Sequence, residues 1–153
     1  MLHVGDSAPD FKLMNAAGEL IHLSNLLGKM VVLYFYPKDD TSGCTAEALD
    51  FTAHQKDFEK AGAIILGISP DGVKSHKKFI DKHKLGIELL SDDEKQVVNA
   101  YSVWVEKSMY GRKYMGVERS TFLLGPDGKI IKLWRKVKVK GHIEAVLEAV
   151  KNA

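Results

Sequence analysis

The sequence predicts a single α/β domain in which helices flank a central mixed β-sheet. Two apolar runs, Met30–Tyr36 and Ala63–Ser69, have the length and β-branched content of strands that are buried on both faces of a sheet. A helical pattern from about Thr45 to Lys60 separates them, which makes a βαβ unit with a right-handed crossover. The chain of 153 residues is long enough for one domain with a real core, so we expect one domain over residues 1–153.

The other elements follow from periodicity and turn residues. Before the βαβ unit, Phe11–Leu13 and Leu20–His22 alternate apolar and polar residues around a glycine-containing turn, which predicts an N-terminal β-hairpin. After it we expect, in chain order, a helix from Val73 to about His83, a short strand at Glu88–Leu90, a helix capped by Ser91–Glu94, a hairpin of Val117–Leu124 with Lys129–Val137, and a final helix Gly141–Lys151. This order is that of a thioredoxin-like fold.

Composition narrows the function. Hydrophobic residues make up 45% and charged residues 27% of the chain, as in a soluble globular protein, and the net charge of +2 favours no nucleic-acid partner. The start, Met1–Asp6, lacks the pattern of a secretory signal, and the longest apolar run is too short to span a membrane. The single cysteine excludes an internal disulfide. We therefore expect a cytoplasmic protein without a membrane partner.

Cys44, the only cysteine, is the main candidate for chemistry. It lies in the predicted first turn of the helix after the Met30–Tyr36 strand, where free backbone N–H groups and the helix dipole stabilise a thiolate. Its helical spacing to Ala48, Phe51 and Phe58 predicts that the sulfur faces inward. The alternative is a small buried hydrophobic residue without chemistry.

The residues around Cys44 carry a resemblance to a known family. Pro37, Thr41 and Cys44 form the pattern Pro-x-x-x-Thr-x-x-Cys at a strand-to-helix junction, which resembles the active-site signature of the peroxiredoxins. Four further stretches resemble the bacterioferritin-comigratory, or peroxiredoxin Q, branch: Gly5–Phe11, Val31–Tyr36, Leu89–Asp92 and Tyr110–Phe122. The resemblance implies a thioredoxin-like fold and a thiol-dependent peroxidase in which Cys44 becomes a sulfenic acid.

The resemblance also implies an arginine that faces the thiolate, and Arg119 within Glu118–Phe122 matches it. In a strand-like run from Val117 to Leu123 a long charged side chain is poorly placed unless it meets an anion, although an arginine that ends at the surface is the alternative. Glu47, one turn after Cys44, is expected to orient Arg119; the alternative is a solvated helix glutamate.

The remaining site residues are expected to shape the pocket and to bind the peroxide. Pro37 has no N–H and fixes its own φ, so it forms part of the pocket wall. Thr41 is expected to place its hydroxyl beside the thiolate, to cap the helix, or to do both. The backbone N–H groups of Gly43 and Cys44 are expected to stabilise the charge that moves to the leaving oxygen.

No metal or other cofactor is expected. The six histidines show no spacing typical of metal ligands, such as His-x-x-x-His, and displacement at a peroxide oxygen by a thiolate needs no haem or flavin.

The reductive half-reaction departs from the family. Many relatives carry a second, resolving cysteine at the position of Leu49 or near Ile80, and this chain has neither. Residues five apart in a helix have Cα atoms roughly 8–9 Å apart, beyond the about 7 Å limit for a disulfide. We therefore expect reduction by an external thiol, either thioredoxin, glutaredoxin or a small thiol.

Two alternative functions and the oligomeric state remain to be considered. A thiol–disulfide oxidoreductase on the same scaffold is disfavoured by the absence of Cys-x-x-Cys, and a peroxide sensor that does not turn over is the other alternative. The resemblance favours a monomer over a dimer. Lys136, Lys138 and Lys140 are expected on an edge strand, where lysines block unwanted pairing; a surface for a nucleic acid or an acidic partner is the alternative. The aromatic group of Trp104, Tyr110 and Tyr114, with Met109 and Met115, is expected to be packing; the alternative is an apolar rim of the active site that favours alkyl hydroperoxides.

Overall fold

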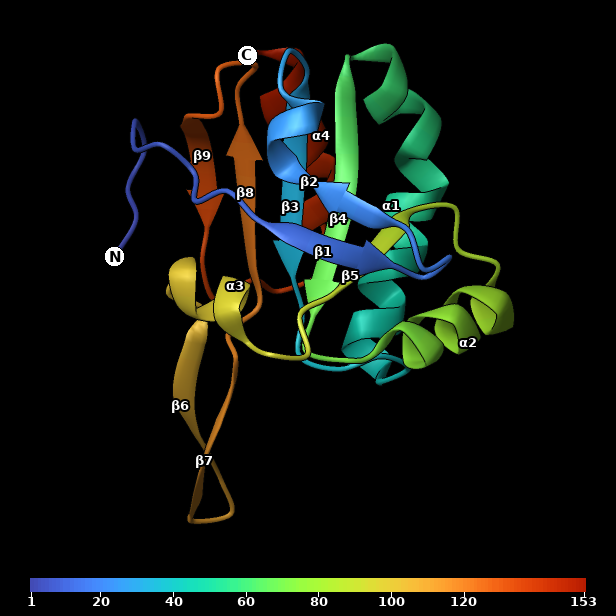
Figure 1. Ribbon diagram of the computed structural model, residues 1–153, viewed down its shortest axis with the longest axis vertical. Coiled ribbons are helices and arrows are strands. Elements are labelled where there is room, and N and C mark those ends of the chain that lie inside the picture. The colour runs from blue at the N-terminus through green and yellow to red at the C-terminus, as the bar shows by residue number, and fades with distance from the viewer.

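A computed structural model describes residues 1–153 and shows a seven-stranded mixed sheet with helices on its faces (Figure 1). The elements in chain order are β1 Lys12–Asn15, β2 Leu20–His22, a 3₁₀ helix η1 Leu23–Leu26, β3 Met30–Phe35, α1 Ser42–Lys60, β4 Ala63–Ser69, α2 Val73–His83, β5 Glu88–Ser91, α3 Gln96–Ala100, β6 Trp104–Met109, β7 Arg112–Val117, β8 Ser120–Leu124, β9 Ile130–Trp134 and α4 His142–Lys151. The mixed α/β class is confirmed.

The sheet has the strand order β2-β1-β5-β4-β3-β8-β9. β3 pairs in parallel with β4, and β4 in parallel with β5, whereas the other pairs are antiparallel. Because β3 and β4 are parallel and adjacent, the predicted βαβ unit is confirmed, and the loops after both strands lie at the same edge of the sheet. That edge carries the Cys44 segment.

Both faces of the sheet are buried, and β3 shows why its sequence has no polar positions. Val32 and Tyr34 point into the apolar layer that includes Phe51 of α1 and Ile143 of α4. Val31, Leu33 and Phe35 point into the opposite layer, with Leu23 of η1 and Val98 of α3. Alternate side chains of one strand thus contribute to two cores, which is the reason for a continuous apolar run.

Several boundaries differ from the predictions. α1 begins at Ser42 instead of Thr45. The second hairpin is shorter than predicted, because β8 begins at Ser120 instead of Val117 and β9 ends at Trp134 instead of Val137. The predicted cap of α3 by Ser91–Glu94 is confirmed for its carboxylates but not for its hydroxyl, because the Ser91 hydroxyl has no hydrogen-bond partner. The Asp92 carboxylate accepts the first free N–H groups of that helix instead.

A β-hairpin arm, β6–β7, was not anticipated from the sequence. It forms a separate two-stranded sheet that extends away from the body of the molecule (Figure 1). The expected packing of the aromatic group is wrong toward the tip of the arm, where Tyr110 is 98% exposed and Met109 is 56% exposed. At the base of the arm, Trp104 packs against the core and Val117 is part of it. A tip without a covering layer has no core to join.

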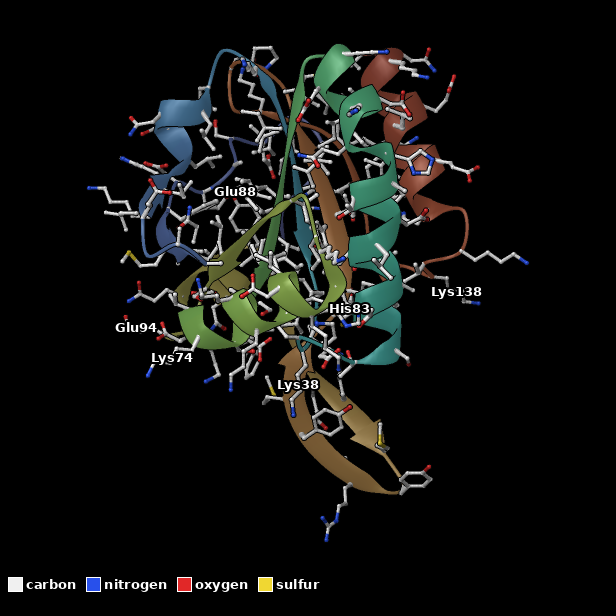
Figure 2. All side chains as sticks on the ribbon, turned by 90° about the vertical axis from the view of Figure 1, so that its right-hand side faces the viewer. Lys38, Lys74, His83, Glu88, Glu94 and Lys138 are labelled. Atoms are coloured by element: carbon white, nitrogen blue, oxygen red, sulfur yellow. The ribbon has the colours of Figure 1, made fainter.

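The lysine-rich segment lies beyond the sheet edge. β9 is an edge strand, but it ends at Trp134, so Lys136, Lys138 and Lys140 belong to the connection that leads to α4. Figure 2 shows Lys138 projecting from that connection. The assignment of these lysines to an edge strand is therefore wrong. None of the four α-helices combines the length and the apolar character that a membrane span needs.

Candidate active site

Cys44 is the third residue of α1, at the sheet edge where β3 ends. Its side chain is 1% exposed, and it shares a buried helix face with Ala48, Phe51 and Phe58. The helical spacing seen in the sequence therefore places the sulfur inward, as expected. In the first turn of a helix of 19 residues, the sulfur lies at the positive end of the helix dipole.

Arg119 brings a fixed cation to this sulfur. The sequence suggested that Arg119 lies within a strand, and this is wrong. Glu118 and Arg119 occupy the break between β7 and β8. The break frees the side chain to turn toward α1. Its Nη2 donates to Cys44 Sγ at 3.3 Å, and its Nη1 donates to Glu47 Oε1 at 2.7 Å. One rigid guanidinium fork thus joins the thiol to a carboxylate.

Glu47 is a buried partner and not a solvated glutamate. Its side chain is 0% exposed, Oε1 accepts from Arg119, and Oε2 has no hydrogen-bond partner. Burial raises the pKa of Glu47 to about 7, and the Arg119 guanidinium limits that rise. For Arg119, burial lowers the pKa, but the charges of Glu47 and Cys44 outweigh this and raise it, so the guanidinium stays charged.

Gly43 permits the approach of the guanidinium. A Cβ atom on this residue would lie 3.1 Å from Arg119 Nη2, closer than most side-chain contacts. The guanidinium of Arg119 therefore packs against the backbone at Gly43, where it contacts the sulfur of Cys44. This steric requirement was not apparent from the sequence, which suggested only a role for the backbone N–H.

Thr41 and Pro37 lie in the loop that joins β3 to α1. Thr41 is the N-cap residue of α1, but its hydroxyl caps no helix amide and donates to the Lys38 carbonyl at 2.8 Å. The hydroxyl is therefore turned into the loop, and neither predicted role of that hydroxyl is seen as a hydrogen bond. Pro37 is half-buried just after β3. Both residues are brought near the start of α1, as the motif spacing required.

Two residues that sequence reasoning missed also surround the site. Burial, together with the negative charges of Glu47 and Cys44, raises the pKa of Tyr34 on β3 well above its ordinary value. Burial and the Arg119 charge lower the pKa of Lys107 on the arm. Tyr34 was read only as an apolar strand residue, and Lys107 lies in the arm that the sequence did not predict. Periodicity gave no signal for either.

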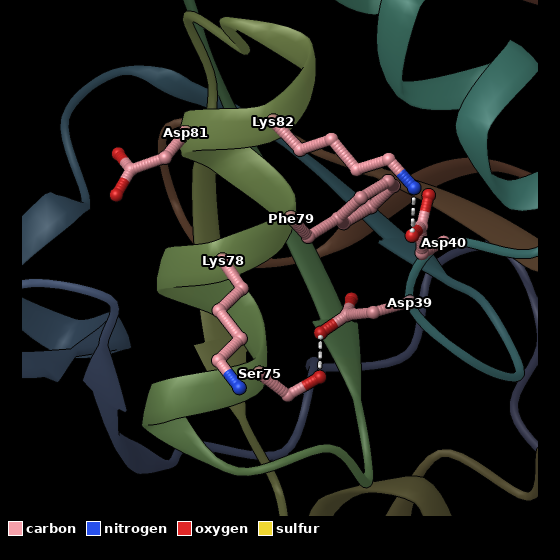
Figure 3. Close-up of a pocket in the computed structure, with 7 residues that line it drawn as sticks. All are labelled: Asp39, Asp40, Ser75, Lys78, Phe79, Asp81 and Lys82. Carbon is pink, nitrogen blue, oxygen red and sulfur yellow. Dashed lines mark hydrogen bonds and ion pairs between the residues drawn. The ribbon is translucent and has the colours of Figure 1, made fainter.

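One cluster has the composition of a metal site. A carboxylate oxygen of Asp39, a carboxylate oxygen of Asp71 and a ring nitrogen of His76 lie within 4.8 Å of one another, behind the loop that carries Thr41. Sequence spacing did not reveal it, because three separate segments supply the residues. A cavity of about 620 Å³ lies beside it, lined by Asp39, Asp40 and residues of α2 (Figure 3).

Comparison with known proteins identifies the family of the chain. Residues 4–133 match the model of the AhpC/TSA family. Peroxiredoxin Bcp of Bacillus subtilis is 48% identical over 151 residues, which cover 99% of this chain and 96% of that protein. Peroxiredoxin Bcp of Escherichia coli is 39% identical over 151 residues, with 99% and 97% covered.

Solved structures agree in fold. A cysteine-to-serine variant of PrxQ from Xylella fastidiosa superposes with a TM-score of 0.94 at 40% identity, covering 99% of this chain and 97% of that one. A bacterioferritin comigratory protein from Xanthomonas campestris, solved as trapped intermediate and ligand complexes in a study of alkyl peroxide reduction, superposes with a TM-score of 0.89 at 48% identity, covering 93% and 90%. These neighbours have the thioredoxin fold. The chain belongs to the AhpC/TSA family, as a peroxiredoxin of the Bcp/PrxQ branch in which Cys44 is the only cysteine.

Proposed function

We propose that this protein is a thiol-dependent peroxidase that reduces hydrogen peroxide and organic hydroperoxides at Cys44. The observation that carries the proposal is the 3.3 Å contact between Arg119 Nη2 and Cys44 Sγ, at the first turn of α1. A fixed positive charge and a helix N-terminus on one sulfur favour a thiolate. Family membership and the alkyl peroxide work on the Xanthomonas campestris relative support the same chemistry.

The reaction is a displacement at oxygen. The Cys44 thiolate attacks one oxygen of the peroxide, an S–O bond forms as the O–O bond breaks, and the other oxygen leaves as water or an alcohol after it takes a proton. The sulfur is oxidised to a sulfenic acid. Negative charge moves from sulfur to the leaving oxygen, and the Arg119 guanidinium lies beside both, so it stabilises the charge throughout the step.

The other site residues have supporting roles in this proposal. The N–H groups of Gly43 and Cys44 stabilise the reacting oxygens, and Glu47 holds the guanidinium in its orientation. Pro37 excludes water from the sulfur. Thr41 already donates a hydrogen bond to the Lys38 carbonyl, so the lone pairs of its oxygen remain to accept a hydrogen bond from the O–H of the peroxide.

The second half-reaction uses an external thiol. A thiol attacks the Cys44 sulfenic acid, water leaves and a mixed disulfide forms; a second thiol then releases reduced Cys44 and a new disulfide. No other cysteine is present in the 153 residues to replace that thiol. We propose thioredoxin, glutaredoxin or a small thiol as reductant, a cytoplasmic location where such thiols are abundant, and a monomer as the working form.

Intact mass measurement tests the proposal. The protein and Cys44→Ser are each treated with one equivalent of hydrogen peroxide in the presence of a sulfenic-acid trap. A rapid adduct on the native protein that is absent in Cys44→Ser is the expected result, and unmodified folded protein would refute it. Repeated turnover with an external thiol then distinguishes an enzyme from a sensor, which would be oxidised once without cycling.

A further inference from the structure

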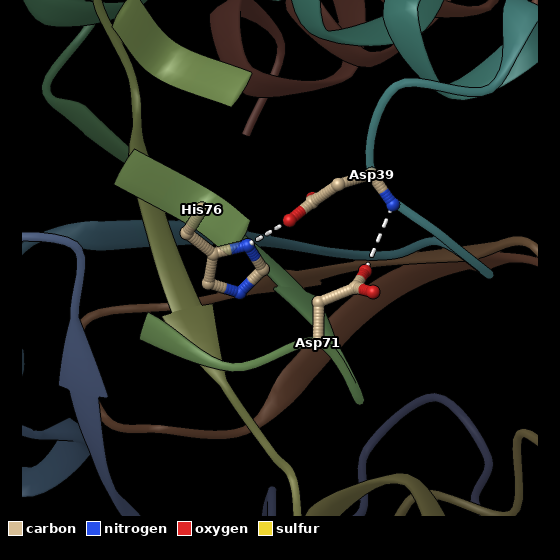
Figure 4. Close-up of side chains that lie close together, drawn as sticks. All are labelled: Asp39, Asp71 and His76. Carbon is tan, nitrogen blue, oxygen red and sulfur yellow. Dashed lines mark hydrogen bonds and ion pairs between the residues drawn. The ribbon is translucent and has the colours of Figure 1, made fainter. Parts of the chain in front are cut away.

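A fully buried histidine lies behind the active-site loop and takes no part in the chemistry proposed above. His76 is in the first turn of α2, and its side chain is 0% exposed. It faces Asp39, which is 3% exposed and lies in the loop between Pro37 and Thr41 (Figure 4). Buried ionisable groups need partners that balance their charge, so the hydrogen bonds of this pair define its state.

Both ring nitrogens of His76 face acceptors. Nδ1 is 2.7 Å from Asp39 Oδ2, and Nε2 is 2.9 Å from the carbonyl oxygen of Leu90 on β5. A carbonyl oxygen and a carboxylate oxygen accept hydrogen bonds and do not donate them. A neutral imidazole has one N–H, so it satisfies only one of these contacts. One additional proton must therefore lie between the ring and Asp39.

The other partners of Asp39 place that proton on the ring. The Tyr36 hydroxyl donates to Oδ1 at 2.6 Å, and the Ser75 hydroxyl donates to Oδ2 at 2.7 Å (Figure 3). Burial, with a contribution from Asp39, raises the pKa of Tyr36 well above its usual range, so Tyr36 remains a donor. Hydrogen bonds donated to a carboxylate favour its ionised form, which leaves the proton on His76.

Asp71 adds a second carboxylate to the cluster. Its Oδ2 accepts the backbone N–H of Asp39 at 2.8 Å and the hydroxyl of Ser69 at 2.7 Å. A metal ion would balance these two carboxylates, but a metal needs a bare ring nitrogen, and both nitrogens of His76 are directed at acceptors. An imidazolium ring supplies the positive charge without a metal.

We propose that His76 is a doubly protonated positioning residue whose imidazolium holds Asp39 and thereby fixes the loop that leads to Cys44. The kinetic part of this inference rests on the proposed peroxidase function, whereas the charge state of the ring does not. Through the Leu90 carbonyl the ring also joins the loop to the edge of the central sheet. The loop backbone carries Pro37 and Thr41, so its conformation sets where a peroxide meets the sulfur.

The neighbouring residue Asp40 offers a matched control. It pairs with the last turn of α2, through Lys82 at 2.6 Å and His83 at 2.7 Å, but its side chain is 41% exposed. Figure 3 shows the two aspartates bound to different parts of the same helix. Aspartate to asparagine at position 39 therefore removes a buried ion pair. The same substitution at position 40 removes surface ion pairs, which contribute little to stability.

The kinetic test compares Asp39→Asn, His76→Gln and the double variant with Asp40→Asn. The rate constants for Cys44 with hydrogen peroxide and with iodoacetamide are measured for each, because the alkylating agent needs the thiolate but not the aligned loop. We expect the peroxide-to-iodoacetamide ratio to fall by about tenfold or more in both single variants. The double variant should be no slower than either, and Asp40→Asn should be unchanged. Equal ratios in folded Asp39→Asn and native protein would overturn the positioning role.

The charge state is tested by ¹⁵N–¹H spectroscopy of histidine-labelled Cys44→Ser at neutral pH. The expected signature is a ring with slowly exchanging N–H protons on both nitrogens, absent in His76→Gln and unaffected by added Zn²⁺. A bare nitrogen, or a stoichiometric shift on adding Zn²⁺, would overturn it. If peroxide does not oxidise native Cys44, the proposed function fails while this spectrum still decides the charge of His76.

Discussion

Removal of the Arg119 charge should slow the oxidation of Cys44 without abolishing the fold. At 3.3 Å, and with an effective dielectric constant of about 20, two unit charges interact by roughly 5 kcal/mol. The side chain is 17% exposed and therefore partly screened. A hydrogen bond to a charged group contributes about 1.5–3 kcal/mol. Arg119→Met should thus lower the second-order rate constant by about ten- to a hundredfold.

The same substitution has a second effect that must be separated from the first. It leaves Glu47, which is 0% exposed, without its cation. Breaking a buried pair costs about 3–5 kcal/mol of stability when the remaining group stays charged; the cost is smaller here, because burial raises the pKa of Glu47 to about 7 even beside the guanidinium and the carboxyl takes up a proton when that cation is lost. The double variant Arg119→Met/Glu47→Gln removes both charges. It should regain part of the stability in urea unfolding but none of the oxidation rate.

The assay is stopped-flow mixing with hydrogen peroxide, followed by the fluorescence of the protein or by a trapped sulfenic acid. Glu47→Gln alone keeps the guanidinium charge and should lose only a few-fold in rate, because orientation and not charge is changed. An Arg119→Met protein that is folded and is oxidised as fast as the native one would refute the electrostatic role of Arg119. A double variant that recovers the native rate would show that the loss came from the unpaired carboxylate.

Four further predictions concern the same site and its support. Gly43→Ala should slow oxidation several-fold with unchanged or higher melting temperature, because the new methyl group meets the guanidinium while alanine favours a helix; an unchanged rate would contradict the crowding. Between about pH 4.5 and 7 the folded protein holds a proton on Glu47 that the unfolded chain has released, so the free energy of unfolding of the native protein should fall relative to that of Glu47→Gln as the pH rises through this window. His142 contributes the opposite slope: burial, with the Arg119 charge, lowers its pKa to about 4 from 6.5, so the unfolded chain takes up a proton first, and the stability of the native protein relative to His142→Gln should fall as the pH drops from about 6.5 to 4; a pH-independent difference between the two would refute this. Phe51→Ala should cost about 3–5 kcal/mol in urea unfolding, since its ring is 0% exposed and stacks on Tyr34 at 4.5 Å.

The β-hairpin arm shows where sequence reasoning failed. The central strands β3 and β4 have partners on two sides and a core on both faces, so their sequences show long apolar runs. β6 and β7 pair only with each other and expose most of their side chains, which leaves a mixed pattern without a clear period. The aromatic residues at their tip looked like core residues for that reason.

The sequence by itself determined the βαβ unit, the inward direction of Cys44 and the segment that carries the family's motif. These depend on neighbours along the chain: a buried strand, a loop residue without an N–H, and a helix whose first turn stabilises an anion. The fixed spacing of Pro37, Thr41 and Cys44 carries this local information completely. The sequence also predicted Arg119 as a site residue through its resemblance to the family, although it placed that residue in a strand.

Only the tertiary structure decided which distant groups meet this segment. Arg119 reaches Cys44 because the chain breaks between β7 and β8, and Asp39 meets His76 because α2 folds back beside the loop. Asp39 and His76 are separated by 37 positions in the sequence, and Cys44 and Arg119 by 75. Contacts over such separations leave no periodic pattern in one sequence, because many different chain paths are compatible with the same local pattern. Charge balance in a buried site is set by which groups are brought together, and that is a property of the fold.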